Sequence, residues 1–84
     1  MTWAELHRES ERLATEAQLS LLARNAGQTT ELYKRAAEFE KRALDLLDVS
    51  KARTRGITAV SAVALWYKAG EYALAEQLAY SILA

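Results

Sequence analysis

The chain has a single histidine, His7, and Glu11 follows it one helical turn later. Imidazole and carboxylate groups both bind zinc, and this spacing would place them on one face of a helix. A structural zinc site needs about four ligands and a catalytic site about three, so this pair does not complete a site. The residues around it, from Glu5 to Arg12, form an ordinary charged helix face. We therefore expect no metal and no other cofactor.

Motifs for covalent catalysis and phosphate binding are missing from the 84 residues. The sequence has no cysteine, which excludes a thiolate nucleophile, a thiolate metal site and a disulfide. Its three glycines form no Gly-rich loop, and no serine or threonine stands in a recognised catalytic spacing. A short helical chain also leaves little room for a concave substrate pocket. We expect a protein that is not an enzyme.

One local basic cluster is formed by Lys51, Arg53 and Arg55. These side chains could bind an acidic segment or a phosphate. The favoured alternative is that they neutralise Asp45 and Asp48, just upstream. The whole chain carries 11 basic and 11 acidic residues, so it lacks the concentrated positive field that nucleic acid requires. We expect no nucleic-acid partner.

The composition also bears on the compartment. The absence of cysteine fits a reducing environment. The N-terminus is charged from Glu5 onward and has no apolar segment typical of a signal peptide. The longest uncharged stretch, which includes residues 57–67, is shorter than the roughly 20 residues of a bilayer span. We expect a cytoplasmic protein that enters no membrane.

The elements that position these residues are predicted to be helices. Alanine and leucine, with Glu, Lys and Arg, dominate the composition, and no proline interrupts them. No segment alternates apolar and polar residues as a strand does. The sequence predicts one all-α domain over residues 1–84, with four antiparallel helices in two helix-turn-helix hairpins, 2–48 and 50–84.

Polar residues and glycines mark the expected helix ends in the first hairpin. Thr2 and Glu5 have the spacing of a capping box at the start of the first helix. Gly27 can end that helix, because glycine adopts the left-handed conformation without steric cost. The second helix is then expected to begin near Thr29 or Thr30.

In the second half of the chain, the second helix is expected to run to about Asp48, and Ser50 or Asp48 to cap the third helix. Gly56 suggests a close approach of another helix backbone. The third helix is apolar nearly all round over residues 57–67, so we expect it to be surrounded by the other helices. In the first helix, Ser10 interrupts the apolar stripe, which predicts loose packing there.

Two Ala-Gly pairs, Ala26-Gly27 and Ala69-Gly70, divide the predicted hairpins. Each pair is followed by a tyrosine that precedes an alanine by three residues, Tyr33 with Ala36 and Tyr72 with Ala75. Repetition on this scale is typical of helical-repeat proteins.

The second hairpin, with Trp66, Gly70, Tyr72 and Ala75 followed by Ile82-Leu83, resembles the tetratricopeptide repeat. The resemblance covers residues 58–83 and is looser in the first hairpin. It implies that Trp66 packs inside the hairpin, that Gly70 makes the turn, and that Tyr72 and Ala75 let the helices approach closely. It also implies a right-handed superhelical stack, and an unrelated four-helix bundle is the alternative.

The same resemblance assigns the residues that would contact a partner. Ile57, Val60 and Ala64 stand where repeats that clamp a peptide carboxylate carry Lys and Asn, and Tyr67 faces the groove with Lys68 beside it. Apolar residues at these positions do not suit a carboxylate clamp. We therefore expect the partner to be a protein or peptide that binds through an apolar surface.

The last helix, expected from Tyr72 to the end, has more apolar surface than one contact covers. Solenoid proteins usually have more repeats and polar terminal helices, so this surface indicates an interface, most simply a homodimer. A heteromeric partner or a further helix would cover it equally well. The residues assigned to self-association are Leu74, Leu78, Tyr80, Ile82 and Leu83.

The sequence thus predicts a non-enzymatic, tetratricopeptide-like module or scaffold for protein–protein interaction, which self-associates through its last helix. The alternative is a small regulatory or structural helical-bundle subunit, adaptor or antitoxin-like, that acts by oligomerising. Both functions depend on surfaces rather than on a catalytic site.

Overall fold

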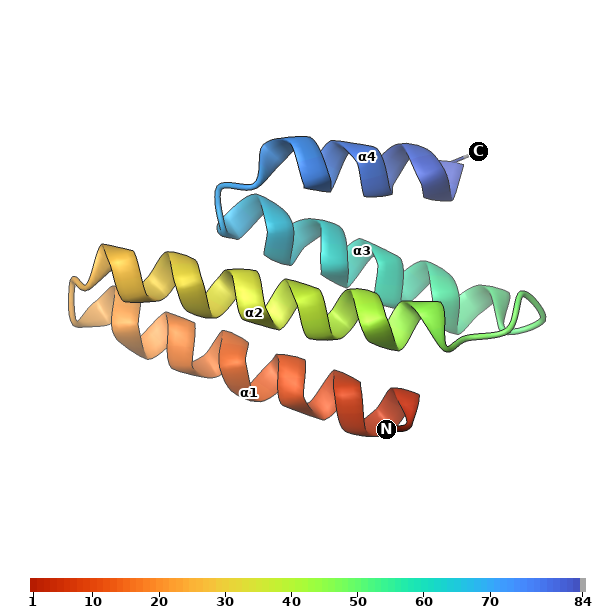
Figure 1. Ribbon diagram of the computed structural model, residues 1–84, viewed down its shortest axis with the longest axis horizontal. Helices are drawn as coiled ribbons and strands as arrows, with labels where there is room; N and C mark the ends of the chain where they lie inside the picture. Colours follow the sequence, from red (N-terminus) through yellow and green to blue (C-terminus); the bar gives the residue numbers. More distant parts are fainter. Residues whose placement is uncertain (84) are drawn as a thin grey trace.

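The computed structural model describes residues 1–83, and for Leu83 its backbone alone. Over these residues the protein consists of four helices without a strand: α1 (Trp3–Leu22), α2 (Ala26–Asp45), α3 (Ala52–Lys68) and α4 (Tyr72–Leu83). Consecutive helices run antiparallel and pack in a row, α1 on α2, α2 on α3 and α3 on α4 (Figure 1). The predicted all-α architecture of four antiparallel helices is confirmed. Because α1 and α4 lie at opposite edges, the row is open rather than closed into a bundle (Figure 1).

The core follows this row from α1 to α4. In α2, Ala36, Ala37 and Ala43 are completely buried, and these small side chains let α1 and α3 pack closely on its two sides. Leu13 of α1 is also completely buried, and Trp66 of α3 lies in the same cluster. Helix α2 therefore needs two apolar faces, whereas α4, at the edge, needs one.

The predicted capping box at the start of α1 is confirmed. The Thr2 hydroxyl accepts a hydrogen bond from the Glu5 backbone N–H at 3.2 Å, and the Glu5 carboxylate accepts one from the Thr2 N–H at 3.0 Å. The hydrogen bond from the Thr2 backbone N–H to the carboxylate, with a smaller contribution from the Thr2 side chain, lowers the pKa of Glu5. The cap fixes the first turn of α1 and thereby the position of the side chains that follow.

The turn between α1 and α2 differs from the prediction. Gly27 lies inside the first turn of α2, and Arg24 adopts the left-handed conformation instead, with φ 60°. The Asn25 side chain accepts a hydrogen bond from the Gln28 N–H at 3.2 Å and caps α2, so the helix begins before Thr29. A good N-cap residue thus takes precedence over the glycine that follows it.

The predicted boundary between α2 and α3 is also corrected. Helix α2 ends at Asp45, and Lys51, at the N-cap of α3, makes no side-chain capping bond. Neither Ser50 nor Asp48 caps α3, because the Asp48 carboxylate accepts the Ser50 N–H at 3.1 Å within the connecting turn. Gly56 is approached by no backbone, since a Cβ atom built there would meet nothing within 4 Å.

The first turns of α1 are well packed, contrary to the expectation from Ser10. This residue is buried, and its hydroxyl donates a hydrogen bond to the Ala36 carbonyl of α2 at 2.8 Å. A small polar side chain permits a close helix crossing there and has a partner for its hydroxyl group. The interruption of the apolar stripe therefore marks a specific contact.

Candidate interaction surface

One face of α3 is apolar and open to solvent. Ile57, Val60 and Tyr67 are 62%, 67% and 64% exposed, and Ala64, on the same helical stripe, is exposed as well. The prediction that α3 is surrounded is wrong, because only α2 and α4 pack extensively on it (Figure 1). Four of the five residues assigned to partner contact therefore share one accessible stripe.

A hollow between α3 and α4 continues this stripe. Its first part has a volume of about 200 Å³ and is lined by Val60, Val63, Ala79 and Ile82. The adjoining part, of about 470 Å³, is lined by Val63, Tyr67, Tyr72, Ala75, Glu76 and Ala79. Both parts share Val63 and Ala79 as their floor, and Glu76 is the only charged residue in either lining. We call the exposed surface around this hollow the α3/α4 face and define it by Ile57, Val60, Ala64, Tyr67, Tyr72 and Ile82.

The hairpin residues lie partly where the resemblance placed them. Trp66 and Ala75 are buried, and Gly70 makes the turn with φ 77°. Tyr72 is different, because it lies at the surface with its ring tilted against that of Tyr67, at 5.1 Å between centroids. Tyr72 therefore contributes to the α3/α4 face and does not pack inside the hairpin.

Two other assignments are corrected, that of Lys68 to partner contact and that of Leu78 to self-association. Lys68 turns toward α2, where its Nζ lies 5.7 Å from the centroid of the Tyr33 ring. Leu78 belongs to the protein's own core and is only 8% exposed, so it cannot serve self-association. The assignments for α4 also divide between two sides, since Ile82 borders the α3/α4 face while Leu74 lines a different hollow beside Trp66.

The remaining two assignments on α4 are Tyr80 and Leu83. Tyr80 is exposed and lines none of the hollows described here. The side chain of Leu83 lies outside the described part of the structure. The residues assigned to self-association therefore do not share a single face of α4. The accessible apolar surface is instead shared between α3 and α4.

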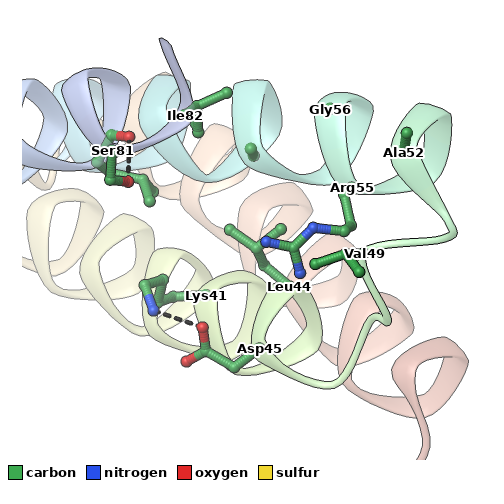
Figure 2. A pocket seen from close by; sticks show the side chains of 11 residues that line it. Lys41, Leu44, Asp45, Val49, Ala52, Arg55, Gly56, Ser81 and Ile82 are labelled. Carbon is green, nitrogen blue, oxygen red and sulfur yellow. Dashed lines mark hydrogen bonds and ion pairs between the residues drawn. The ribbon is translucent and has the colours of Figure 1, made fainter. Parts of the chain in front are cut away.

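A second groove, on α3 between α2 and α4, has a volume of about 330 Å³ (Figure 2). Lys41 and Asp45 of α2 form an ion pair at 2.6 Å on one wall, and Ser81 and Ile82 lie on the α4 side. Arg55 extends from α3 into the groove toward α2 (Figure 2). The charged side chains of this groove are thus engaged by the protein itself.

The basic cluster does not neutralise the upstream carboxylates, which corrects the favoured interpretation. Within the described residues, Asp45 pairs with Lys41, and no ion pair joins Lys51, Arg53 or Arg55 to either aspartate. Arg55 instead donates from Nη1 to the Leu47 carbonyl at 2.7 Å, which satisfies a backbone acceptor just beyond α2. The cluster therefore divides into one structural arginine and two exposed cations, Lys51 and Arg53.

His7 and the neighbouring Trp3 together link α1 to α2 and α3, which the sequence did not indicate. Its Nε2 lies 2.6 Å from Glu11, and its Nδ1 lies 2.9 and 3.0 Å from the two carboxylate oxygens of Glu40 on α2. The Trp3 ring stacks on His7 at 5.0 Å, and its Nε1 donates to the Thr58 hydroxyl of α3 at 3.2 Å. Among the described residues there is no group of three or more ligands that could hold a metal ion.

The pKa of His7 reflects this environment. Burial lowers the pKa, but the hydrogen bond and charge of Glu40, together with the charge of Glu11, outweigh burial and raise it above the usual 6.5. Glu40 is itself only 1% exposed, and within the described residues no lysine or arginine forms an ion pair with it. His7 and Glu40 thus form a polar contact that joins α1 to α2.

Similarity to known proteins does not assign a function to the surfaces described above. Comparisons with protein-family models, with curated proteins and with solved structures found no match to this chain. No helix in the described part of the chain has both the length and the hydropathy needed to cross a membrane. The function is therefore inferred from the geometry of the α3/α4 face.

Proposed function

We propose that this protein is a non-enzymatic helical interaction module that binds another protein through the α3/α4 face. The observation that carries the proposal is a stripe of exposed apolar side chains that includes Val60 and Ala64, on a helical protein whose other half is highly charged. Apolar surface of this extent marks interaction sites on soluble proteins. The hollow, with Val63 and Ala79 as its floor, is a concave surface into which side chains of a partner can pack.

The second hairpin supports a tetratricopeptide-like mode of action. The buried Trp66 and Ala75 and the left-handed Gly70 occupy the places that such a hairpin requires, while the exposed Tyr72 departs from it. The open row of helices leaves the side chains of α3 accessible to a partner. Because the sequence lacks cysteine, we place the module in a reducing compartment, the cytoplasm.

Site-specific photo-crosslinking in cells tests this function. A photoreactive side chain at Ala64, in the centre of the face, should give covalent protein adducts, whereas the same group at Ala4, exposed on α1, should give none. Adding Val60→Glu should abolish the adduct because it places a charge in the apolar contact. The matched Val49→Glu, at a valine that is exposed in the α2–α3 connection, should preserve it. The absence of any protein adduct at position 64 would refute the proposed function.

A further inference from the structure

The exposed stripe of α3 has the same spacing when read in either direction. From Ile57 to Val60, Ala64 and Tyr67 the steps are three, four and three residues. If two such stripes meet antiparallel, Ile57 faces Tyr67 of the other copy, and Val60 faces its Ala64. A larger side chain then meets a smaller one at the centre, which is how helix surfaces interdigitate.

The charges at the two ends of the α3/α4 face are opposite in sign. Arg53, exposed, continues the stripe one turn before Ile57, and Glu71 lies in the turn that follows α3 at the opposite end. Glu76, one turn into α4, lines the hollow beside Tyr67. An antiparallel pair therefore brings each arginine toward the carboxylates of the other copy, whereas a parallel pair would bring the two arginines together.

The apolar area of the face is close to that of an ordinary dimer contact. With about 150–250 Å² per aromatic side chain and roughly 100 Å² per aliphatic one, its exposed side chains present roughly 400 Å². A standard interface buries about 800 Å² on each partner, of which roughly 500 Å² is apolar. The face and its polar rim therefore approach what one symmetric contact requires.

From the spacing, the charges and the area together, we infer that the α3/α4 face binds the same face of a second copy, with the two α3 helices antiparallel about a two-fold axis. This inference rests on the proposed function and names its partner. It gives an isologous contact, in which each interaction occurs twice. Arg53 then lies beside the carboxylates at positions 71 and 76 of the other copy, at both ends of the interface.

Sedimentation equilibrium of the full chain, at concentrations up to ~1 mM, measures the association directly. The wild type should approach twice the monomer mass as its concentration rises. Val60→Glu should remain monomeric, because each copy would bury a carboxylate against Ala64 of the other copy without a partner for its charge. Val49→Glu should associate like the wild type, and circular dichroism should show both variants to be equally helical.

A charge exchange tests the antiparallel orientation. Arg53→Glu and Glu76→Lys should each weaken the dimer on the order of tenfold, because each repulsive contact occurs twice. The double variant, which exchanges the two charges, should recover most of that loss. Lys51→Glu makes the same charge change at the same helix end but on the other side of α3, so it should leave the association unchanged.

These variants separate loss of association from loss of folding. A carboxylate in the first turn of α3 favours the helix, so Arg53→Glu should not unfold it. A wild-type chain that stays monomeric over the whole concentration range would overturn the inference, as would a dimer unaffected by Val60→Glu. If that monomeric chain still formed an adduct with another protein through position 64, the proposed function would stand and only the second copy would be excluded.

Discussion

The two hairpins solve the same packing problem with different chemistry. Between α1 and α2, directional polar contacts supplement the apolar core, from Ser10 to the Ala36 carbonyl and from His7 to Glu40. Between α3 and α4, no side-chain hydrogen bond is formed in the described residues, and the contact is apolar. The first hairpin therefore has a fixed register and a charged exterior, while the second keeps apolar surface available for a partner.

The largest expected effect distinguishes the two cores. Leu13→Ala in α1 should lower the free energy of unfolding by about 3–5 kcal/mol, because the site is completely enclosed and cannot collapse. Leu78→Ala in α4 should cost about 2–3 kcal/mol, since this side chain lies on the edge helix and borders open grooves. Urea unfolding of both variants measures the difference. Equal losses would show that the edge helix is as tightly packed as the first hairpin.

A smaller effect should follow from breaking the polar contact of the first hairpin. His7→Gln should lower the free energy of unfolding by about 1–3 kcal/mol at pH 6, because it leaves the buried Glu40 carboxylate without its cation. Glu11→Gln, which changes only the exposed partner of His7, should cost about 0.5 kcal/mol. If both variants lost the same free energy of unfolding, the contact of His7 with Glu40 would not be the one that stabilises the fold.

The same contact predicts the pH dependence of stability. Since the pKa of His7 is raised in the folded protein above its usual 6.5, protonation of His7 stabilises the fold. This stabilisation should be complete below about pH 6.5 and be lost as the pH rises through the raised pKa. Urea unfolding at a series of pH values should show this loss in the wild type and not in His7→Gln. A rise in stability over the same interval would contradict the assignment.

The smallest effects should come from the two hairpin turns, which share one hydrogen-bonding pattern. Arg24 and Gly70 are both left-handed and follow their helices at the same position, each donating to the carbonyl three residues before it. Arg24→Gly should stabilise the protein by about 0.5–1 kcal/mol, and Gly70→Ala should destabilise it by about 1 kcal/mol. Thermal unfolding measures both changes. Effects of the same sign would show that backbone strain is not what distinguishes the turns.

The turns also show how far the sequence determines the fold. Helix content, antiparallel order and the cap at Thr2 follow from local chemistry, and the structure agrees with each of them. The first turn was misplaced because the Ala-Gly pair at Gly27 appeared equivalent to the pair at Gly70. In the structure the equivalent of Gly70 is Arg24, and Asn25, through its capping bond, draws Gly27 into the helix.

The candidate site was predictable only in part. The spacing of Ile57, Val60, Ala64 and Tyr67 defines one stripe of a helix whatever surrounds it, so the sequence could identify it. Its exposure could not be foreseen, because α3 is apolar on every side and the number of its neighbours depends on the whole row. The same applies to Glu40, whose burial depends on the register between α1 and α2.

The stacking of Trp3 on His7 has a spectroscopic consequence. The chain has two tryptophans, and the structure places one in each hairpin, Trp3 at the start of α1 and Trp66 within α3. A protonated imidazole stacked on an indole quenches its fluorescence, so emission from Trp3 should brighten as His7 loses its proton. Trp66, buried in the core cluster, should emit at shorter wavelength and should not respond to the titration of His7. The pH-dependent part of the emission therefore reports on Trp3 and its contacts with His7 and α3, separately from the core around Trp66.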